Sequence, residues 1–190
     1  MKHTIFAVLF IFALLLPVHV FAESYQGLVV GVSDGDTFKL LVTGNKQIRV
    51  RLAEIDTPES AQPYGSKAKQ ELSGLIFGKT VTVNVEDTDR YGRTVGRVSA
   101  DGIDVNAEMI RRGAAWVYRQ YAKDQSLFGL EEEAKQEKRG LWSLPESERV
   151  PPWEWRLTGH SKSTTQEKKT ISKTPQKSDG GFTCAGKRIC

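Results

Sequence analysis

The order of strand-like and helix-like segments constrains this chain more than any other feature of its sequence. Five short runs are rich in β-formers or alternate apolar with polar residues: 25–32, 37–42, 47–53, 80–85 and 94–100. Three stretches have helical spacing of apolar residues, each with a glycine close behind it: 63–77, 104–112 and 124–139. The order is therefore three strands, one helix, two strands and two helices.

Five short antiparallel strands with a helix between the third and fourth predict a small closed Greek-key barrel, the OB-fold. The expected class is α+β, mainly β, with three helices around a five-stranded barrel. Apolar residues make up 39% and charged residues 26% of the chain, and these globular proportions exclude a wholly disordered or polytopic membrane protein. Residues 23–157 are predicted to form this domain, which is long enough to bury about two-thirds of its surface.

The first 22 residues have the pattern of a secretory signal peptide. Lys2 precedes an apolar run over residues 5–16, Pro17 interrupts the run, and Ala22 stands before the expected cleavage point. The alternative is an uncleaved anchor, but a spanning helix needs about 20 apolar residues and this run is shorter. We therefore expect export to the periplasm or the medium, with no stable membrane insertion after cleavage.

The composition changes beyond the predicted barrel. Residues 158–181 are dominated by Ser, Thr, Lys, Gln, Gly and Pro, which predicts a disordered basic linker. Residues 182–190 form a short segment in which Cys184 and Cys190 either form a disulfide after export or remain free thiols. A tether to a cell wall or a polyanion is a second interpretation of this basic tail.

The positive charge of the chain belongs to its tail. The formal net charge is +4, yet residues 23–159 carry 19 basic and 21 acidic side chains, whereas residues 160–190 carry 7 basic and 2 acidic ones. Overall basicity is therefore no argument that the barrel binds nucleic acid. If the barrel acts on polyanions, specific residues must be responsible.

Three short charged segments lie at turns or strand ends of the predicted barrel. They are DGDT at 34–37, RLAEIDTPE at 51–59 and DRYGR at 89–93. Each segment alone could equally be a turn with surface ion pairs. Together they contain what phosphodiester hydrolysis requires, namely oxygen ligands for a hard cation, a carboxylate base and guanidinium groups that stabilise a phosphorane.

Within these segments each role has a candidate. The predicted metal ligands are Asp36, Asp56 and the backbone carbonyl of Thr57. Glu59 is the candidate base for the attacking water. The negative charge that develops on the phosphate would be stabilised by two guanidinium forks, Arg51 and Arg93.

These segments resemble the staphylococcal-nuclease (thermonuclease) family, as do RRGAAWVY and KRGLW further along the chain. The resemblance covers residues 25–155 and implies an OB-fold barrel with three helices. It also implies calcium-dependent hydrolysis of DNA and RNA that leaves 3′-phosphate ends, with Ca²⁺ on the ligands named above. By motif position it makes Asp34 an outer-shell carboxylate and places Tyr91 and Tyr118 against the nucleotide.

The chain departs from the family pattern near the expected substrate groove. The loop after Glu59 and the segment after Gly113 are both short, and Trp116 stands where a tyrosine is expected. Trp116 is either a ring that stacks on the substrate or a core or rim aromatic. The expected partners are single-stranded or locally melted DNA and RNA, and we expect a monomer with no obligate protein partner.

Other features are predicted to be structural. The segment PPWEW at 151–155 is expected to seal the barrel, and the glutamates at 131–133 are expected to form a solvated helix face. The histidines lie in the predicted signal and linker, so none is available as a catalytic base. The alternative function is a non-catalytic OB-fold nucleic-acid-binding module, a class that lacks the carboxylate and arginine set that this chain keeps.

Overall fold

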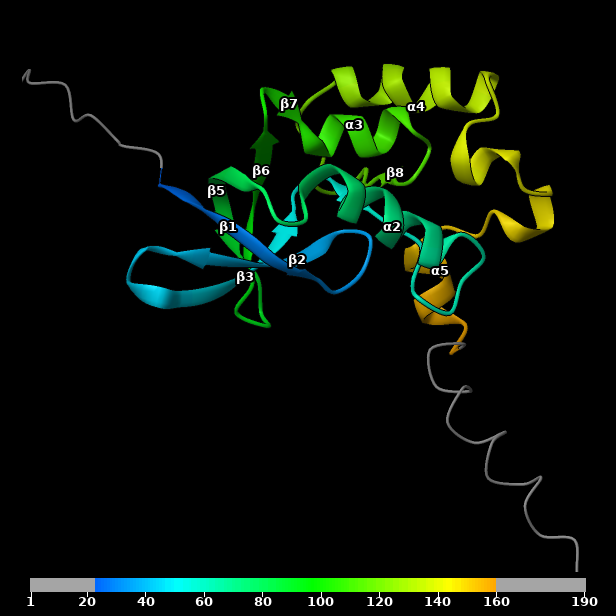
Figure 1. Ribbon diagram of the computed structural model, residues 1–190. Coiled ribbons are helices and arrows are strands. Elements are labelled where there is room, and N and C mark those ends of the chain that lie inside the picture. The colour runs from blue at the N-terminus through cyan, green and yellow to red at the C-terminus, as the bar shows by residue number, and fades with distance from the viewer. Residues whose placement is uncertain (1–22, 160–190) are drawn as a thin grey trace, which may run out of the picture.

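The computed structural model of this protein describes residues 23–159 (Figure 1). The predictions for the signal peptide, for the linker beyond residue 159 and for the Cys-containing segment lie outside the described residues. The strands are β1 Ser24–Val32, β2 Thr37–Val42, β3 Lys46–Leu52, β4 Ile55–Asp56, β5 Thr80–Thr88, β6 Thr94–Ala100, β7 Ile103–Asp104 and β8 Trp116–Val117. The helices are α2 Gly65–Ile76, α3 Val105–Arg111, α4 Ser126–Gln136 and α5 Pro152–Leu157, with 3-10 turns at Thr43–Asn45, Gly140–Ser143 and Glu146–Glu148.

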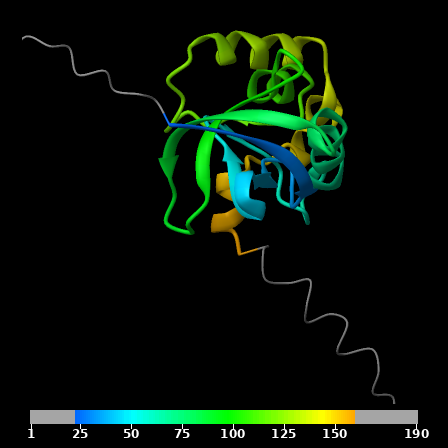
Figure 2. The ribbon, with the colours of Figure 1, turned by 60° about the vertical axis from the view of Figure 1, so that its left-hand side comes forward.

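The five long strands close into a barrel, so the predicted five-stranded architecture is confirmed (Figure 2). The strands follow the order β3-β2-β1-β5-β6-β7, and a further pairing joins β3 to β6. This closing pair is parallel, with Val50 opposite Thr94 and Leu52 opposite Gly96, so the expectation of purely antiparallel strands is wrong at this pairing. The reason is topological, because the chain crosses over through α2 and β5 before β6 returns beside β3 in the same direction.

Alternation along the strands fills the barrel interior. Phe38 and Leu40 of β2 and Val50 and Leu52 of β3 are all fully buried, while Lys39 between the first two is exposed. A period of two residues places each apolar side chain on the inner face, and burying one of them contributes about 1.5–3 kcal/mol. The interior is therefore tightly filled, and it holds in place the strand ends that carry the charged segments.

The helices pack on two ends of the barrel. In both views α3 and α4 lie side by side at the top, whereas α5 lies at the bottom (Figures 1 and 2). The three predicted helices correspond to α2, α3 and α4, each one to three residues shorter at either end than expected. Helix α5 was not predicted, since its six residues after Pro151 are too few for a helical period to show. Among residues 23–159, none of the helices has the length and apolar character of a membrane span.

The prediction of a solvated face at residues 131–133 is wrong for Glu131. This side chain is fully buried, and its carboxylate accepts the Val117 amide at 2.9 Å, Arg119 at 2.9 Å and Lys135 at 2.8 Å. Helix α4 packs on β8, so an inward carboxylate can satisfy a strand amide that has no strand partner. Burial alone would raise the pKa of Glu131, but the hydrogen bonds from Arg119 and Lys135 outweigh it and lower the pKa.

Glu131→Gln is expected to lower the free energy of unfolding at pH 7 by about 1–3 kcal/mol, because a buried charged acceptor is lost. A folded pKa below the ordinary 4.5 means that this contribution is present above the unfolded pKa and disappears as pH falls through the folded pKa. Urea unfolding of the variant and wild type should therefore converge only as the pH falls below 4.5 and through the lowered folded pKa of Glu131. Glu132→Gln, one exposed position along, is the control, and a pH-independent difference for Glu131→Gln would contradict the prediction.

Candidate active site

The turn at residues 34–36 packs directly against the segment that follows β3. A Cβ atom on Gly35 would lie 2.7 Å from the Thr57 Oγ1 atom, so only glycine allows this approach. The Asp36 amide donates to Asp34 Oδ1 at 3.1 Å, and the Leu52 amide donates to the Asp36 carbonyl at 2.9 Å. These contacts bring Asp34 and Asp36 of the first charged segment beside Thr57 of the second.

Arg51 joins the carboxylates of these two segments. Its Nη2 atom lies 2.8 Å from Asp56 Oδ1 and 3.1 Å from Asp36 Oδ2, while Nη1 donates to the Ile55 carbonyl at 3.2 Å. Both carboxylates are buried, and the Arg51 side chain is 14% exposed. One guanidinium therefore fixes two acidic side chains, one from the turn before β2 and one from β4.

A bend at Glu54 turns the chain from β3 into β4. Glu54 adopts a left-handed conformation with φ of 64°, and its buried carboxylate accepts the amides of Lys123 and Asp124 at 2.5 and 2.9 Å. Arg97 pairs with the same carboxylate at 2.9 Å, and the Glu54 carbonyl accepts the Tyr118 amide at 2.8 Å. These bonds offset the strain of the bend and hold Tyr118 at the edge of the charged cluster.

The turn before β6 presents Arg93. Asp89 Oδ1 accepts the Tyr91 and Arg93 amides at 2.9 Å each, and Asp89 Oδ2 accepts Arg93 Nε at 2.7 Å. Burial would raise the pKa of Asp89, but the bonds from Arg93 and Tyr91 outweigh it and lower the pKa. Arg93 Nη1 donates to Thr37 Oγ1 at 3.1 Å, and this hydroxyl donates to Asp36 Oδ1 at 2.9 Å. The third segment is thus linked to the first.

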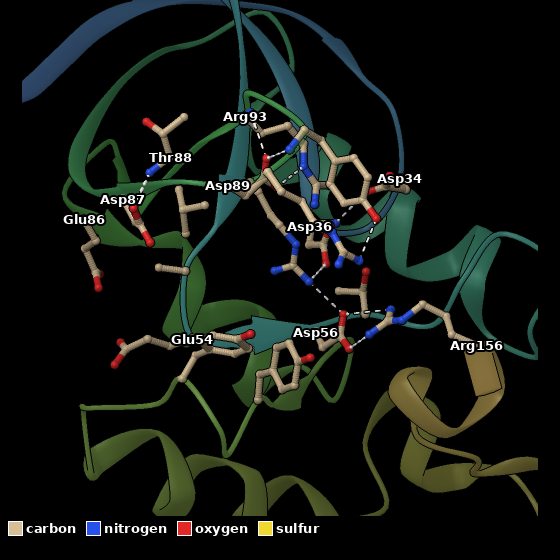
Figure 3. Close-up of a pocket in the computed structure, with 18 of the residues that line it drawn as sticks. Asp34, Asp36, Glu54, Asp56, Glu86, Asp87, Thr88, Asp89, Arg93 and Arg156 are labelled. Carbon is tan, nitrogen blue, oxygen red and sulfur yellow. Dashed lines mark hydrogen bonds and ion pairs between the residues drawn. The ribbon is translucent and has the colours of Figure 1, made fainter.

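Arg156 enters the cluster from α5 and was missed by the sequence reasoning (Figure 3). Its Nη2 donates to Asp56 Oδ2 at 2.6 Å, and its Nη1 donates to Glu59 Oε1 at 2.7 Å and reaches Asp56 Oδ1 at 3.4 Å. Arg156 and Asp56 are 100 residues apart, and a single arginine after PPWEW carries no signal of this contact. Only the path of the C-terminal segment around the barrel brings them together.

The loop that carries Glu59 is fastened to the same C-terminal segment. The Glu59 amide donates to Gln62 Oε1 at 2.7 Å, and Gln62 Nε2 donates to the Val150 carbonyl at 3.0 Å. Gly65 lies so close that a Cβ atom there would be 1.9 Å from the Glu59 carbonyl oxygen. Gln62, which the sequence reasoning also missed, is a buried amide that orients this loop.

Burial strengthens the electrostatic interactions of the cluster. Burial, and then the neighbouring charge of Asp36, raises the pKa of Asp34 to about 6. Burial also raises the pKa of Asp56, although bonds to Arg156 and Arg51 oppose this shift. The burial of Arg51 would lower its pKa, but the charges of Asp36 and Asp56 raise it overall. Buried carboxylates held in this way favour a cationic partner.

The donor chemistry fits a hard cation. Asp36 and Asp56 supply carboxylate oxygens and Thr57 a backbone carbonyl, which are the ligand types that Ca²⁺ takes. Within residues 23–159, however, no three acidic, His or Cys side chains form a ready-made metal cluster. Guanidinium groups lie on the oxygens of Asp56 instead.

The charged groups line one open cleft with a volume of about 710 Å³. Nine of the ten site residues named from the sequence contribute to its wall: Asp34, Asp36, Arg51, Asp56, Thr57, Glu59, Tyr91, Arg93 and Tyr118. The tenth, Trp116, is placed elsewhere among the described residues. Its ring lies edge-on to Trp142 at 4.3 Å and to Trp153 at 5.9 Å, which favours the interpretation of a packed aromatic over a substrate-stacking one.

Comparison with known proteins agrees with this arrangement. Residues 49–144 match the family described as Staphylococcal nuclease homologue. An "Uncharacterized endonuclease" of Escherichia coli O157:H7 is 47% identical over 157 residues, covering 82% of this chain and 98% of the relative. A "Micrococcal nuclease" of Shigella flexneri is 44% identical over 144 residues, covering 70% and 80%. The chain therefore belongs to the family of staphylococcal nuclease homologues.

Proposed function

We propose that this protein is a calcium-dependent nuclease that hydrolyses DNA and RNA with low sequence specificity and leaves 3′-phosphate ends. The observation that carries the proposal is the meeting of three distant segments in one cleft. There Arg51 bridges Asp36 and Asp56, and Glu59 and Arg93 line the same wall. The names of the relatives, endonuclease and micrococcal nuclease, support the same reaction class.

In this proposal the carboxylates position a cation and the substrate. Asp36, Asp56 and the Thr57 carbonyl would hold Ca²⁺, and Asp34, bonded to the Asp36 amide, would act from outside the ligand shell. The cation, when bound, supplies charge stabilisation at a phosphate oxygen. Tyr91 and Tyr118 would contact the phosphate and base of an extended strand, and the position of both residues in the wall of the cleft supports this.

Glu59 and the two arginines would perform the chemical step. The Glu59 carboxylate takes a proton from water, the water oxygen bonds to phosphorus, and the bond to the 5′ oxygen breaks. The departing 5′ oxygen takes up a proton from solvent, and Glu59 returns its own proton to solvent. Arg51 and Arg93 donate hydrogen bonds to the phosphate oxygens as negative charge develops on them. The products are a 3′-phosphate on one fragment and a free 5′-hydroxyl on the other.

We also propose that residues 1–22 direct export and that the mature protein acts as a monomer on single-stranded or locally melted nucleic acid. The apolar N-terminal run supports export. The exposed ring of Tyr91 at the edge of an open cleft supports unpaired bases as substrate, because stacking requires an accessible base face.

The test is digestion of single-stranded DNA and RNA by the chain from residue 23 to residue 190. We expect cleavage with Ca²⁺, loss of cleavage with a calcium chelator, and recovery when Ca²⁺ is restored. Product ends should resist 3′ extension until they are treated with phosphatase. Cleavage that continues in the presence of the chelator, or that leaves 3′-hydroxyl ends, would contradict the proposal. Binding of nucleic acid without cleavage would identify a binding module.

A further inference from the structure

Helix α5 places a cationic side chain where a metal ion would have to bind. The Arg156 guanidinium lies 2.6 Å from Asp56 Oδ2 and 2.7 Å from Glu59 Oε1. Asp56 Oδ1 is already bonded to Arg51 at 2.8 Å, so both oxygens of Asp56 carry a guanidinium contact. Any cation that uses Asp56 must approach these same oxygens to about 2.3–2.6 Å. Arg156 and the cation therefore compete for one carboxylate.

The same contact engages the proposed base. Glu59 Oε1 accepts a charge-assisted bond from Arg156 Nη1, and charge-assisted bonds of this kind are the strong ones. The carboxylate oxygen that Arg156 occupies is not free to accept a hydrogen bond from an attacking water. Arg156 thus acts on a predicted metal ligand and on the predicted base at once.

A second part of α5 covers a ring predicted to contact the nucleotide. Trp153 stacks on Tyr118 with ring centroids 5.6 Å apart and an interplanar angle of 3°. A base cannot occupy the face of Tyr118 that Trp153 covers. One short helix therefore contacts both the carboxylate cluster and the ring of Tyr118.

Helix α5 is held mainly by side chains that are only partly buried. Of its six residues only Pro152 is buried, and Leu157 beside Arg156 is 85% exposed. The Arg156 side chain is itself 38% exposed, so it can leave the carboxylates without opening the barrel core. Elements with few buried apolar contacts open at low free-energy cost.

We propose that α5 is an intramolecular inhibitor whose Arg156 guanidinium occupies the calcium position until Ca²⁺ displaces it. The inference rests on the proposed function, because it assumes that Asp56 holds Ca²⁺. If the free protein is mostly in the closed state, the apparent affinity for Ca²⁺ is reduced by the fraction that is open. Removing Arg156 should restore the intrinsic affinity.

The test is calorimetric titration of Ca²⁺ into the chain of residues 23–190 without nucleic acid. Arg156→Gln should lower the Kd for Ca²⁺ by about 10-fold, which corresponds to an open fraction of about one-tenth in the wild type. Arg149→Gln is the matched control, because Arg149 lies in the same C-terminal segment and donates instead to the Leu144 carbonyl. It removes the same charge and should change the Kd by less than about two-fold.

The possible outcomes distinguish failure of the inhibitor proposal from failure of the proposed nuclease function. Equal Ca²⁺ affinity in Arg156→Gln and wild type, with both proteins cleaving DNA, would refute the proposal that α5 is an inhibitor. The proposal that the protein is a nuclease would stand. Weaker Ca²⁺ binding in Arg156→Gln would also refute the inhibitor proposal. If neither protein bound Ca²⁺ nor cleaved DNA, both proposals would fail. Tighter binding in Arg156→Gln alone, with a matching fall in the Ca²⁺ concentration for half-maximal cleavage, would establish the inhibitor.

Discussion

Glu59→Gln is expected to lower kcat by about 10²–10⁴-fold, the range for loss of a general base. Glutamine keeps the shape of the side chain but cannot take a proton from water. The backbone around it should hold, because the Glu59 amide bonds to Gln62 and not to its own carboxylate. Single-turnover cleavage of a short labelled oligonucleotide at saturating Ca²⁺ measures the effect.

Binding must be measured beside turnover to assign the defect. The affinity of Glu59→Gln for the same oligonucleotide should stay within about three-fold of wild type, since the base acts in the transition state. Glu133→Gln is the control, because Glu133 pairs with Arg139 on the outer side of α4. Wild-type turnover in Glu59→Gln would remove Glu59 from the mechanism.

Arg93→Ala is expected to reduce kcat by about 10²-fold or more, as does removal of a donor that stabilises developing charge. The structure supports this expectation, because Asp89 holds Nε at 2.7 Å and Thr37 accepts Nη1 at 3.1 Å. A guanidinium fixed from two sides is oriented before the substrate arrives. Steady-state kinetics at saturating Ca²⁺ would show the loss mainly in kcat.

A matched arginine provides the control for this variant. Arg111→Ala removes the same charge from the outer face of α3, where Arg111 pairs with Glu108, and kcat should be unchanged. Circular dichroism and urea unfolding of Arg93→Ala should match wild type within about 1 kcal/mol, since the lost ion pair with Asp89 is partly exposed. A loss confined to KM would instead assign Arg93 to substrate binding.

The barrel was predictable because its evidence is local. Strict alternation at Phe38, Leu40 and Val83 marks an inner face within each strand, whatever the rest of the chain does. The parallel pairing of β3 with β6 was not predictable from the sequence, because the relative direction of two strands in a closed sheet depends on the crossover between them. Glu131 was misassigned for a similar reason, since its partner is a strand amide that only packing brings near.

Some residues of the candidate site were also predictable from local patterns, and others were not. The spacing of charges in DGDT, RLAEIDTPE and DRYGR was enough to name Asp36, Asp56 and Arg93, since each segment carries its residues on one turn or strand end. Gln62 and Arg156 could not be named, because an amide in a loop and one arginine in a short helix carry no pattern of their own.

Local patterns in the sequence were therefore enough to predict the barrel, the charged segments and the chemistry that they can support. The packing of distant segments set which other residues share the cleft with them. It brought Arg156 onto Asp56 across 100 residues of chain, and it turned Trp116 toward Trp142. Local patterns report which face of an element is buried, whereas contacts between distant segments depend on how the whole chain packs.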